Sequence, residues 1–308
     1  MPRVERTTRY GPRVDGRGNE AVLLAHLHAA DVADVVAVEA AEGGQAAVAG
    51  LARRRDGSRV FVKAFDEPPA ADVFAAEAEG LAALRMLGGA TTPEVLLAST
   101  DLLVLEALHP RRDDAAFWEH LAHDLARVHS TTHDRFGWHQ DNWLGRRRQA
   151  NTWEEDGFEF FTQHRLLRWL DEPRVQAALD AEDRAALERL CARLPELLPE
   201  RPACLVHGDL WAGNVLATAA GAPALIDPAV SYTWAEIDLA HVWTTSPPPQ
   251  AARFFAVYAE VTGLDAGWRE RVPLVQLRQH LAVVAQFEPD RGAADAIRST
   301  LAPFRRRT

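Results

Sequence analysis

The sequence contains few cysteines and no long apolar run. Its two cysteines, Cys191 and Cys204, stand in apolar surroundings, and their spacing fits neither a metal clip nor a disulfide framework. We therefore expect both thiols to be buried and reduced. No stretch has the length of a membrane-spanning helix or the apolar segment of a signal peptide, so we expect a cytoplasmic protein without a membrane partner.

The chain also lacks an excess of positive charge. Lys and Arg number 34 against 44 Asp and Glu, which gives a formal net charge of −10, and this balance argues against a nucleic-acid partner. An acidic surface would suit a cationic or neutral small substrate, although ordinary solubility explains it equally well. With 308 residues, of which 47% are apolar, the chain can form one large or two modest domains with a substantial core.

Residues 1–107 predict a small, β-rich lobe with one internal helix. Its first 18 residues are polar and we expect them to be flexible, whereas residues 20–33 have helical spacing. The segment 35–65 predicts three strands separated by a Gly-Gly turn and an Asp-Gly turn. Residues 70–88 keep the helical period, and residues 94–108 predict two more short strands around a Ser-Thr-Asp turn.

Residues 108–308 predict a larger, mostly helical lobe. The first of its helices has acids at its start, where the helix dipole favours them. A Trp- and Arg-rich loop over residues 136–151 follows, and short strands later surround a polar motif. A boundary near 108–110 would leave a cleft between two lobes. The helices that we expect in this lobe cover residues 113–130, 152–170, 181–198 and the region after 251.

The polar motif is HGDLWAGN, residues 207–214, and the apolar run PALID that follows it ends at Asp227. Asp209 and Asn214 lie where a strand turns into a loop, so the loop can direct both side chains toward one point. The oxygens of Asn214 and Asp227 are hard ligands that suit Mg²⁺ better than zinc, which leaves Asp209 to accept a proton from a hydroxyl. The order Asp, Asn, Asp matches the base and metal ligands of kinases, although each residue alone could be an ordinary turn residue.

Phosphoryl transfer needs a cation for the donor phosphates, and Lys63 is the candidate. It lies inside the apolar strand RVFVKAF, where an ammonium group needs an anionic partner or a watery edge. Glu77 stands on the apolar stripe of its helix between Val73 and Leu81, whereas Glu79 is turned roughly 200° away. We therefore predict an ion pair between Lys63 and Glu77; a lysine that extends to solvent from a sheet edge is the alternative.

Two further segments are candidates for contact with a nucleotide. Gly43 and Gly44 stand in the first hairpin, upstream of Lys63, where a loop could cover phosphates, although a plain turn explains them nearly as well. Glu106 to Leu108 close the last strand of the small lobe, where backbone groups could meet an adenine. From its position we predict this segment as a hinge.

Together these residues resemble the kinase-like small-molecule phosphotransferases, and most closely the fructosamine kinase family. The resemblance is carried by Lys63, Glu77, HGDLWAGN and LIDPAV…EIDLA. A second signature, FGWHQDNWLG…QANTW…FEFF…HRL, is similar to the family's segment before its long helix. These motifs cover most of the chain, from about Val36 to Leu239.

The resemblance implies an α+β, two-lobed protein-kinase-like fold that uses ATP and Mg²⁺. It implies phosphoryl transfer to a sugar hydroxyl of a ketosamine, a sugar joined to an amine. By motif match Asp209 would be the catalytic base, Asn214 and Asp227 the metal ligands, and Lys63, supported by Glu77, the holder of the ATP phosphates. The partner would be a small amine-linked sugar, and we expect a monomer or weak dimer.

The sequence departs from the family pattern at four places. Gln45 and alanines follow the Gly-Gly pair where a polar Asn or Ser is usual. Trp143 replaces a threonine in NWLG, Gly157 replaces an aromatic residue, and the run YTWAE lacks an arginine. The remaining ATP-side residues match, so we expect phosphotransfer to survive, and the departures bear on the substrate.

The candidate substrate-side residues are Asn142, Trp143, His207 and Trp211. An aromatic ring can face a sugar or an amine, by CH–π or cation–π contact, or it can pack beneath the catalytic loop. We favour a substrate wall for Trp143 and packing for Trp211. His207 stands where kinase-like folds use a histidine to brace the backbone, and we expect Asp238 to brace the catalytic loop from a helix start.

Two other functions fit much of this pattern. A phosphotransferase acting on an aminoglycoside or other aminoalcohol would share the ATP machinery, and an acidic cleft would suit such a polycation. Acids converging from the C-terminal third would favour it, while an aromatic, mostly neutral site would favour a ketosamine. A pseudokinase that binds nucleotide without turnover is supported by the altered glycine loop alone.

Overall fold

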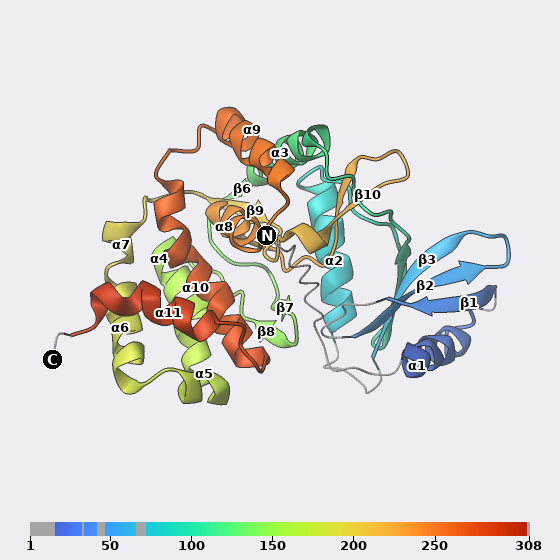
Figure 1. The fold of residues 1–308 in the computed structure, drawn as a ribbon, viewed down its shortest axis with the longest axis horizontal. Coiled ribbons are helices and arrows are strands. Elements are labelled where there is room, and N and C mark those ends of the chain that lie inside the picture. The colour runs from blue at the N-terminus through green and yellow to red at the C-terminus, as the bar shows by residue number, and fades with distance from the viewer. Residues whose placement is uncertain (1–15, 33, 42–46, 66–71, 307–308) are drawn as a thin grey trace, which may run out of the picture. The chain divides into compact units, whose positions relative to one another are not determined.

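The computed structural model describes residues 16–32, 34–41, 47–65 and 72–306. The described chain divides into two compact units, whose elements are labelled in Figure 1. The first unit comprises the described residues up to Ala78 and the segment Pro93–Leu108. The second comprises Glu79–Thr92 and the residues from His109 onward. Our prediction assigned all of 1–107 to one lobe, whereas the structure groups Glu79–Thr92 with the second unit.

The first unit is built on a five-stranded antiparallel sheet with the order β1-β2-β3-β5-β4. The turn between β2 and β3 contains Gly57, whose φ of 86° favours glycine, and the Asp56 carboxylate accepts a hydrogen bond from the Ser58 N–H (2.9 Å). The predicted strands and Asp-Gly turn are thus confirmed. The strands are β1 (Val35–Ala40), β2 (Val48–Arg54), β3 (Arg59–Ala64), β4 (Val95–Ala98) and β5 (Leu102–Glu106).

Helix α1 (Gly16–Ala29) packs against this sheet through Leu23 and Leu27, which have no exposed surface. Val62 of β3 belongs to the same buried cluster, and burial of each such side chain contributes roughly 1.5–3 kcal/mol. Successive residues of a strand point to opposite faces. Lys63 therefore projects from the face of β3 opposite to that cluster.

Helix α2 (Val73–Met86) confirms the predicted helix over 70–88 and ends before two glycines. Gly89 has a φ of 65°, and a Cβ on Gly88 would come 2.9 Å from the Leu84 carbonyl oxygen. Glycine fits both positions because it has no side chain to clash there. Beyond this turn the Arg85 guanidinium donates to the Thr92 carbonyl oxygen (2.6 Å).

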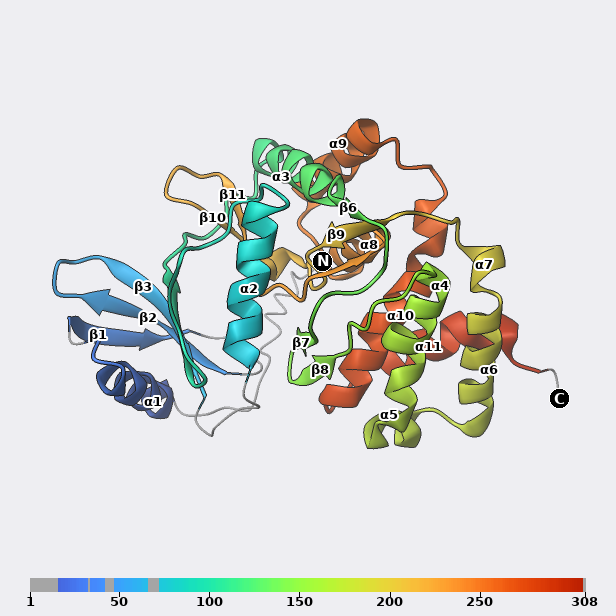
Figure 2. The same ribbon diagram turned by 180° about the vertical axis from the view of Figure 1, so that it is seen from behind.

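In the second unit, helices α3 (Ala115–His129) and α9 (Ala252–Thr262) lie side by side, as Figure 2 shows from the reverse side. The Asp114 carboxylate caps α3 by accepting from the Phe117 N–H (2.9 Å). Helix α9 ends at Gly263, which adopts the left-handed conformation typical of helix C-termini. Both helices were predicted from their periodicity.

Three more helices form the rest of the C-terminal part. Helix α10 (Trp268–Gln286) packs against α8 (Glu236–Thr244) and α11 (Ala293–Leu301). Helix α8 follows the polar motif in the chain, so this packing attaches α10 to the surroundings of that motif. Among the described residues, no helix is sufficiently long and apolar to cross a membrane.

Two stretches predicted as long helices are interrupted instead. Residues 152–170 contain helix α4 (Gly157–Phe160) and then a π-helical segment, η1 (Phe161–Leu166). Apolar spacing alone does not distinguish a π-helix from an α-helix, which is why the sequence missed it. The second stretch breaks into α6 (Ala181–Ala192) and α7 (Leu194–Leu197), because Pro195 has no N–H to continue the α6 ladder.

Short strands surround the polar motif, as predicted. In one sheet β9 (Ala203–Val206) lies between β12 (Ser231–Thr233) and β6 (Thr132–His133), and β10 (Val215–Ala217) pairs with β11 (Pro223–Leu225). The segment predicted as a loop contains the hairpin β7 (Asn142–Leu144) and β8 (Arg147–Gln149). The remaining short elements are η2 (Leu167–Asp171), α5 (Pro173–Ala178), η3 (Ala212–Asn214), η4 (Pro249–Ala251) and η5 (Ala302–Phe304).

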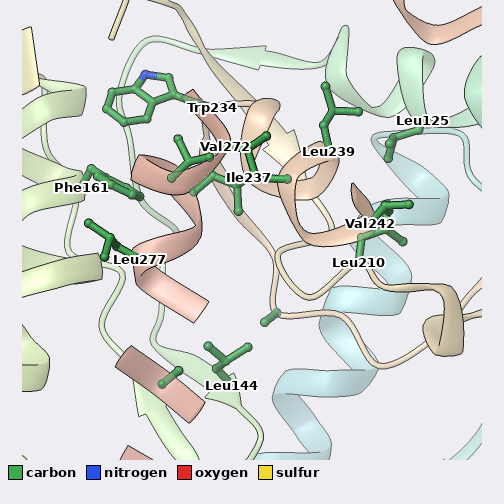
Figure 3. Close-up of a cluster of buried hydrophobic side chains, with 14 of the residues drawn as sticks. Leu125, Leu144, Phe161, Leu210, Trp234, Ile237, Leu239, Val242, Val272 and Leu277 are labelled. Atoms are coloured by element: carbon green, nitrogen blue, oxygen red, sulfur yellow. The ribbon is translucent and has the colours of Figure 1, made fainter. Parts of the chain in front are cut away.

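The core of the second unit extends to the polar motif itself (Figure 3). Leu210, the residue after Asp209, has no exposed surface and belongs to the same buried cluster as Leu239 of α8 and Leu277 of α10. The motif is therefore anchored by its own apolar residue, while the side chain of Asp209 stays 23% exposed.

Both cysteines are buried free thiols, as predicted. Burial raises the pKa of the Cys191 thiol to about 12, so it stays protonated at neutral pH. The Cys204 thiol donates to the Thr233 carbonyl oxygen (3.3 Å). Neither has the electropositive, exposed surroundings of a reactive cysteine.

Candidate active site

The loop HGDLWAGN is held in shape by a glycine and a buried carboxylate. Gly208 has a φ of 82°, and a Cβ there would come 2.0 Å from the Ala229 carbonyl oxygen. No side chain fits in that space. The backbone N–H groups of His207 and Gly208 donate to the two carboxylate oxygens of Asp238, at 2.7 and 2.9 Å. These bonds confirm the predicted bracing by Asp238.

Asp238 has no exposed surface, so its charge depends on these partners. His129 Nε2 lies 3.2 Å from its Oδ2, and His129 Nδ1 lies 2.6 Å from the Tyr258 hydroxyl. Burial alone would raise the pKa of Asp238, but the hydrogen bond and charge of His129, with the Gly208 N–H, outweigh it and lower the pKa. The ionised carboxylate is therefore the form that the folded chain stabilises.

His207 is also fully buried, and both of its ring nitrogens contact the backbone. Its Nδ1 accepts from the Asp209 N–H (3.2 Å), so its Nε2 donates to the Ile226 carbonyl oxygen (2.8 Å). Burial lowers the pKa of the ring, which keeps it neutral. Of the two roles that we considered for His207, this geometry favours bracing over contact with a substrate.

Asp209 keeps 23% of its side chain exposed and is approached on one oxygen by two helices. Gln279 of α10 donates through Nε2 to Oδ1 (3.3 Å), and His241 Nδ1 of α8 lies 3.5 Å from the same oxygen. Burial raises the pKa of Asp209 to about 7, opposed by the charge of Arg278 and assisted by that of Asp227. Such a pKa suits a group that accepts a proton near neutrality.

The predicted metal ligands lie on segments bonded to each other. The Asn214 side chain donates through Nδ2 to the Asp209 carbonyl oxygen (2.9 Å), and the Ile226 N–H donates to the Asn214 carbonyl oxygen (3.1 Å). Asp227, next in the chain, has a φ of 55°, a left-handed conformation that Asp tolerates better than most residues. One amide oxygen and one carboxylate fit Mg²⁺, which keeps several water or phosphate ligands.

In the first unit, Lys63 Nζ lies 2.7 Å from Glu77 Oε1, with 12% and 14% of the two side chains exposed. This ion pair confirms the predicted partner. Glu79 instead accepts from Trp138 Nε1 (2.7 Å) and lies 2.9 Å from His139 Nε2. Lys63 is also the single lysine of the chain, since every other member of the 34 Lys and Arg is an arginine.

The structure says less about the other residues that we predicted to contact the nucleotide. Gly43 and Gly44 lie outside the described residues. Glu106 is exposed at the end of β5, where its N–H donates to the Glu94 carbonyl oxygen (2.9 Å) and its carboxylate accepts from the Glu94 N–H (3.2 Å). Leu108 is half-buried at the end of the first unit. Contact of Glu106 and Leu108 with an adenine stays a prediction.

The substrate-side candidates separate into buried and open residues. Asn142 is 4% exposed and uses both ends of its amide, donating to the Val230 carbonyl oxygen (2.7 Å) and accepting from Gln149 Nε2 (2.9 Å). Trp211 packs its ring against Gly213 of the loop, as we favoured, and keeps 40% of its surface exposed. Trp143 is half-buried in β7, and its contact with a substrate stays a prediction.

Three polar residues around Asp209 escaped the sequence reasoning: His241, Arg278 and Gln279. They belong to α8 and α10; His241 lies just after the EIDLA signature that begins α8, and α10 carries no motif that we recognised. One signal was present, since Arg278 lies three residues from both Val275 and Leu281 and so on an apolar stripe. The same argument identified Glu77. Gln279 Oε1 is buried and has no hydrogen-bond partner among the described residues, which marks this place as unusual.

A hollow of about 470 Å³ lies at the start of α10, away from the motif in the chain. Arg201, Asp265, Glu270 and Arg271 form its charged lining, with Arg271 paired to Asp265 (2.7 Å). None of the predicted site residues lines it. Arg201 and Arg271 are both paired to Asp265, so we assign the hollow no part in the chemistry.

Comparison with known proteins gives a consistent result. A profile of the family described as fructosamine kinase matches residues 21–302. The chain is 33% identical to the probable ketoamine kinase YniA of Escherichia coli K12 over 255 residues, which cover 77% of this chain and 86% of YniA.

Solved structures extend the likeness to the fold. A candidate fructosamine-3-kinase from Thermobifida fusca is 31% identical with a TM-score of 0.78, covering 87% of this chain and 94% of that one. The aminoglycoside phosphotransferase APH(4)-Ia, in a thermostable mutant form, is 15% identical with a TM-score of 0.59, covering 90% of this chain and 98% of that one. The second likeness concerns the fold alone, and together they confirm the expected kinase-like α+β architecture.

Proposed function

Because this chain belongs to the fructosamine kinase family, and is therefore a phosphotransferase that acts on a sugar hydroxyl, we propose that it transfers a phosphoryl group from ATP to a ketosamine. The observation that supports this most strongly is the frame around Asp209. Backbone and side-chain hydrogen bonds connect Asp209, Asn214 and the residue before Asp227. Asp238 fixes the two residues before Asp209.

Asp209 would act as the base for the acceptor hydroxyl. Its Oδ1 faces Gln279 and His241, which leaves the other carboxylate oxygen to orient the hydroxyl and take its proton. In phosphoryl transfer such positioning and electrostatic stabilisation supply most of the rate. The buried bonds of the preceding loop residues reduce the freedom of Asp209 before the substrate arrives.

Lys63 would hold the phosphates of ATP, with Glu77 keeping its ammonium group oriented. Asn214 and Asp227 would hold Mg²⁺, which would offset the negative charge of the donor phosphates. The predicted adenine contact at Glu106–Leu108 and the phosphate cover at Gly43-Gly44 belong to the same proposal.

A polycationic aminoglycoside is the second candidate, since its kinases share the fold. The residues that α10 brings to Asp209 argue against it, because they are Arg278 and Gln279 rather than acids. A cation beside the base repels a polycation, whereas a ketosamine has at most one amine near the reacting hydroxyl. The residues that contact Asp209 therefore support the ketosamine.

A phosphotransfer screen tests the proposal. The purified chain is incubated with ATP and Mg²⁺ and with either a ketosamine such as fructosylglycine or an aminoglycoside, and ADP release and the phosphorylated product are measured. We expect product with the ketosamine, none with the aminoglycoside, and loss of product in Asp209→Asn. Turnover of the aminoglycoside alone would replace the proposal, and nucleotide binding without product from either would support a pseudokinase.

A further inference from the structure

Arg278 is a buried arginine that lacks a counter-ion. Only 3% of it is exposed, and within the described part of the chain it forms no ion pair and one hydrogen bond, from Nη2 to Gln149 Oε1 (2.6 Å). A guanidinium has five N–H donors and is always charged. Burial of such a group without a carboxylate is costly, so the arrangement needs an explanation.

Arg165, in the same unit, shows what a satisfied buried arginine looks like. It is 2% exposed, and its guanidinium donates to the Ala150 carbonyl oxygen, to Asn151 Oδ1 and to Ser231 Oγ. It also lies over the Phe160 ring, 4.4 Å from the centroid. Arg165 thus connects structural segments, whereas Arg278 retains donors that no described residue uses.

The surroundings place Arg278 on the acceptor side of the site. Gln149 is held by its own bonds to Asn142 Oδ1 (2.9 Å) and the Ala229 carbonyl oxygen (3.3 Å), so it fixes the guanidinium rather than following it. The next residue of α10, Gln279, donates to Asp209. The charges of Asp209 and Asp238 favour the charged form of Arg278, although neither carboxylate forms an ion pair with it.

We propose that Arg278 binds the carboxylate of a ketosamine derived from an amino acid, beside the hydroxyl that Asp209 activates. This rests on the proposed function and makes it narrower. A guanidinium binds a carboxylate through two parallel hydrogen bonds, and in an amino-acid ketosamine the carboxylate stands a few bonds from the sugar. The donor phosphates have Lys63 and the metal ligands for their charge, which leaves Arg278 for the acceptor.

The test compares two substrates that differ in a single group, fructosylglycine and fructosylglycinamide. For the wild type we expect kcat/KM about 10- to 100-fold higher with the carboxylate, the range of a hydrogen bond to a charged group. In Arg278→Gln the preference for fructosylglycine over fructosylglycinamide should fall to less than about threefold. The fall should come from a lower kcat/KM for fructosylglycine, and KM for ATP should stay unchanged. Arg278→Lys should recover part of the preference, because it restores charge without the bidentate geometry.

The matched control is Arg269→Gln, on the same helix, where the guanidinium lies 4.8 Å from the Trp243 ring centroid and should leave the preference intact. Thermal unfolding of each variant reports whether it folds. An equal loss on both substrates in Arg278→Gln would overturn the proposal in favour of a phosphoryl contact. A wild type that turns over both substrates equally would overturn it even if that variant does not fold, whereas turnover of neither would refute the proposed function itself.

Discussion

The two units hold their candidate site residues in different ways. In the first, an ion pair joins a strand to a helix, and both side chains are mostly buried, with 12% and 14% of their surface exposed. In the second, Asp209 is fixed by a loop whose backbone is bonded to a fully buried carboxylate, and its side chain is contacted from two further helices. The first arrangement is a local charge pair; the second is a network in which each member depends on several segments.

This difference predicts how each unit responds to substitution. Removal of one partner of this mostly buried ion pair should change ligand binding and also lower stability, because the charge that is left loses its compensation. Removal of a member of the buried network should change stability as well as activity, because it leaves polar groups unsatisfied.

The largest effect is expected at the base. Asp209→Asn should reduce kcat by about two orders of magnitude or more, since an amide cannot accept the hydroxyl proton. Nucleotide binding, measured by calorimetry or fluorescence, should persist within about threefold. Wild-type turnover by this variant, with contaminating kinases excluded by a tag-matched mock purification, would remove Asp209 from its role.

The ion pair of the first unit comes next. Lys63→Met should raise KM for ATP about 10- to 100-fold and lower the melting temperature, because the mostly buried Glu77 loses the cation that offsets its charge. Because the chain has a single lysine, an amine-reactive reagent offers a second readout: peptide mapping should show modification at Lys63 and protection by ATP. Glu77→Gln should weaken ATP binding less than Lys63→Met does. Glu79→Gln should leave ATP binding unchanged, because the Glu79 carboxylate contacts Trp138. Equal effects of the two glutamate variants on KM would contradict the pairing.

Metal dependence separates Asn214 from Asp209. Chelation should abolish turnover, and added Mg²⁺ should restore it. Asn214→Ala should raise the Mg²⁺ concentration for half-maximal rate by about tenfold or more, while Asp209→Asn should not change it. If the Mg²⁺ requirement of Asn214→Ala matches that of the wild type, the amide acts by bracing the Asp209 carbonyl oxygen alone.

The smallest effect concerns acid stability of the network. The pKa of Asp238 lies below its ordinary 3.8 in the folded chain, so the unfolded chain binds the proton more readily. Its contribution to stability is therefore complete above pH 3.8 and is lost as the pH falls through the folded pKa. Urea unfolding between pH 5 and 3, as an approximate window, should give a smaller pH slope for Asp238→Asn than for the wild type. Identical slopes would mean that Asp238 is already protonated when folded.

Much of this organisation was accessible from the sequence because it is local. The turn glycines, the alternation in β3 and the stripe that places Glu77 follow from rules of neighbouring residues. The motif order identified Asp209, Asn214 and Asp227 as a set. Whether Lys63 and these residues serve a single nucleotide stays a prediction.

The residues that escaped prediction act across long separations in the chain. Gln279 and His241 reach Asp209 from other helices, and their periodicity says nothing about which loop they contact. The π-helical segment was not predicted for a different reason. Arg165 on this segment contacts residues of a preceding loop, and the local spacing of apolar residues does not encode such a tertiary contact. The sequence could not give the 40% exposure of Trp211, because an aromatic residue in a motif can be buried or open with the same neighbours.

The space at Gly208 couples two segments mechanically. The Ala229 carbonyl oxygen fills the volume that a side chain at residue 208 would need, and the Ala229 N–H donates to the His207 carbonyl oxygen (2.8 Å). The stretch after Asp227 and the stretch before Asp209 must therefore shift together. Under the proposed function, a shift of Asp227 on binding a cation would therefore be transmitted through this contact to the loop that holds Asp209.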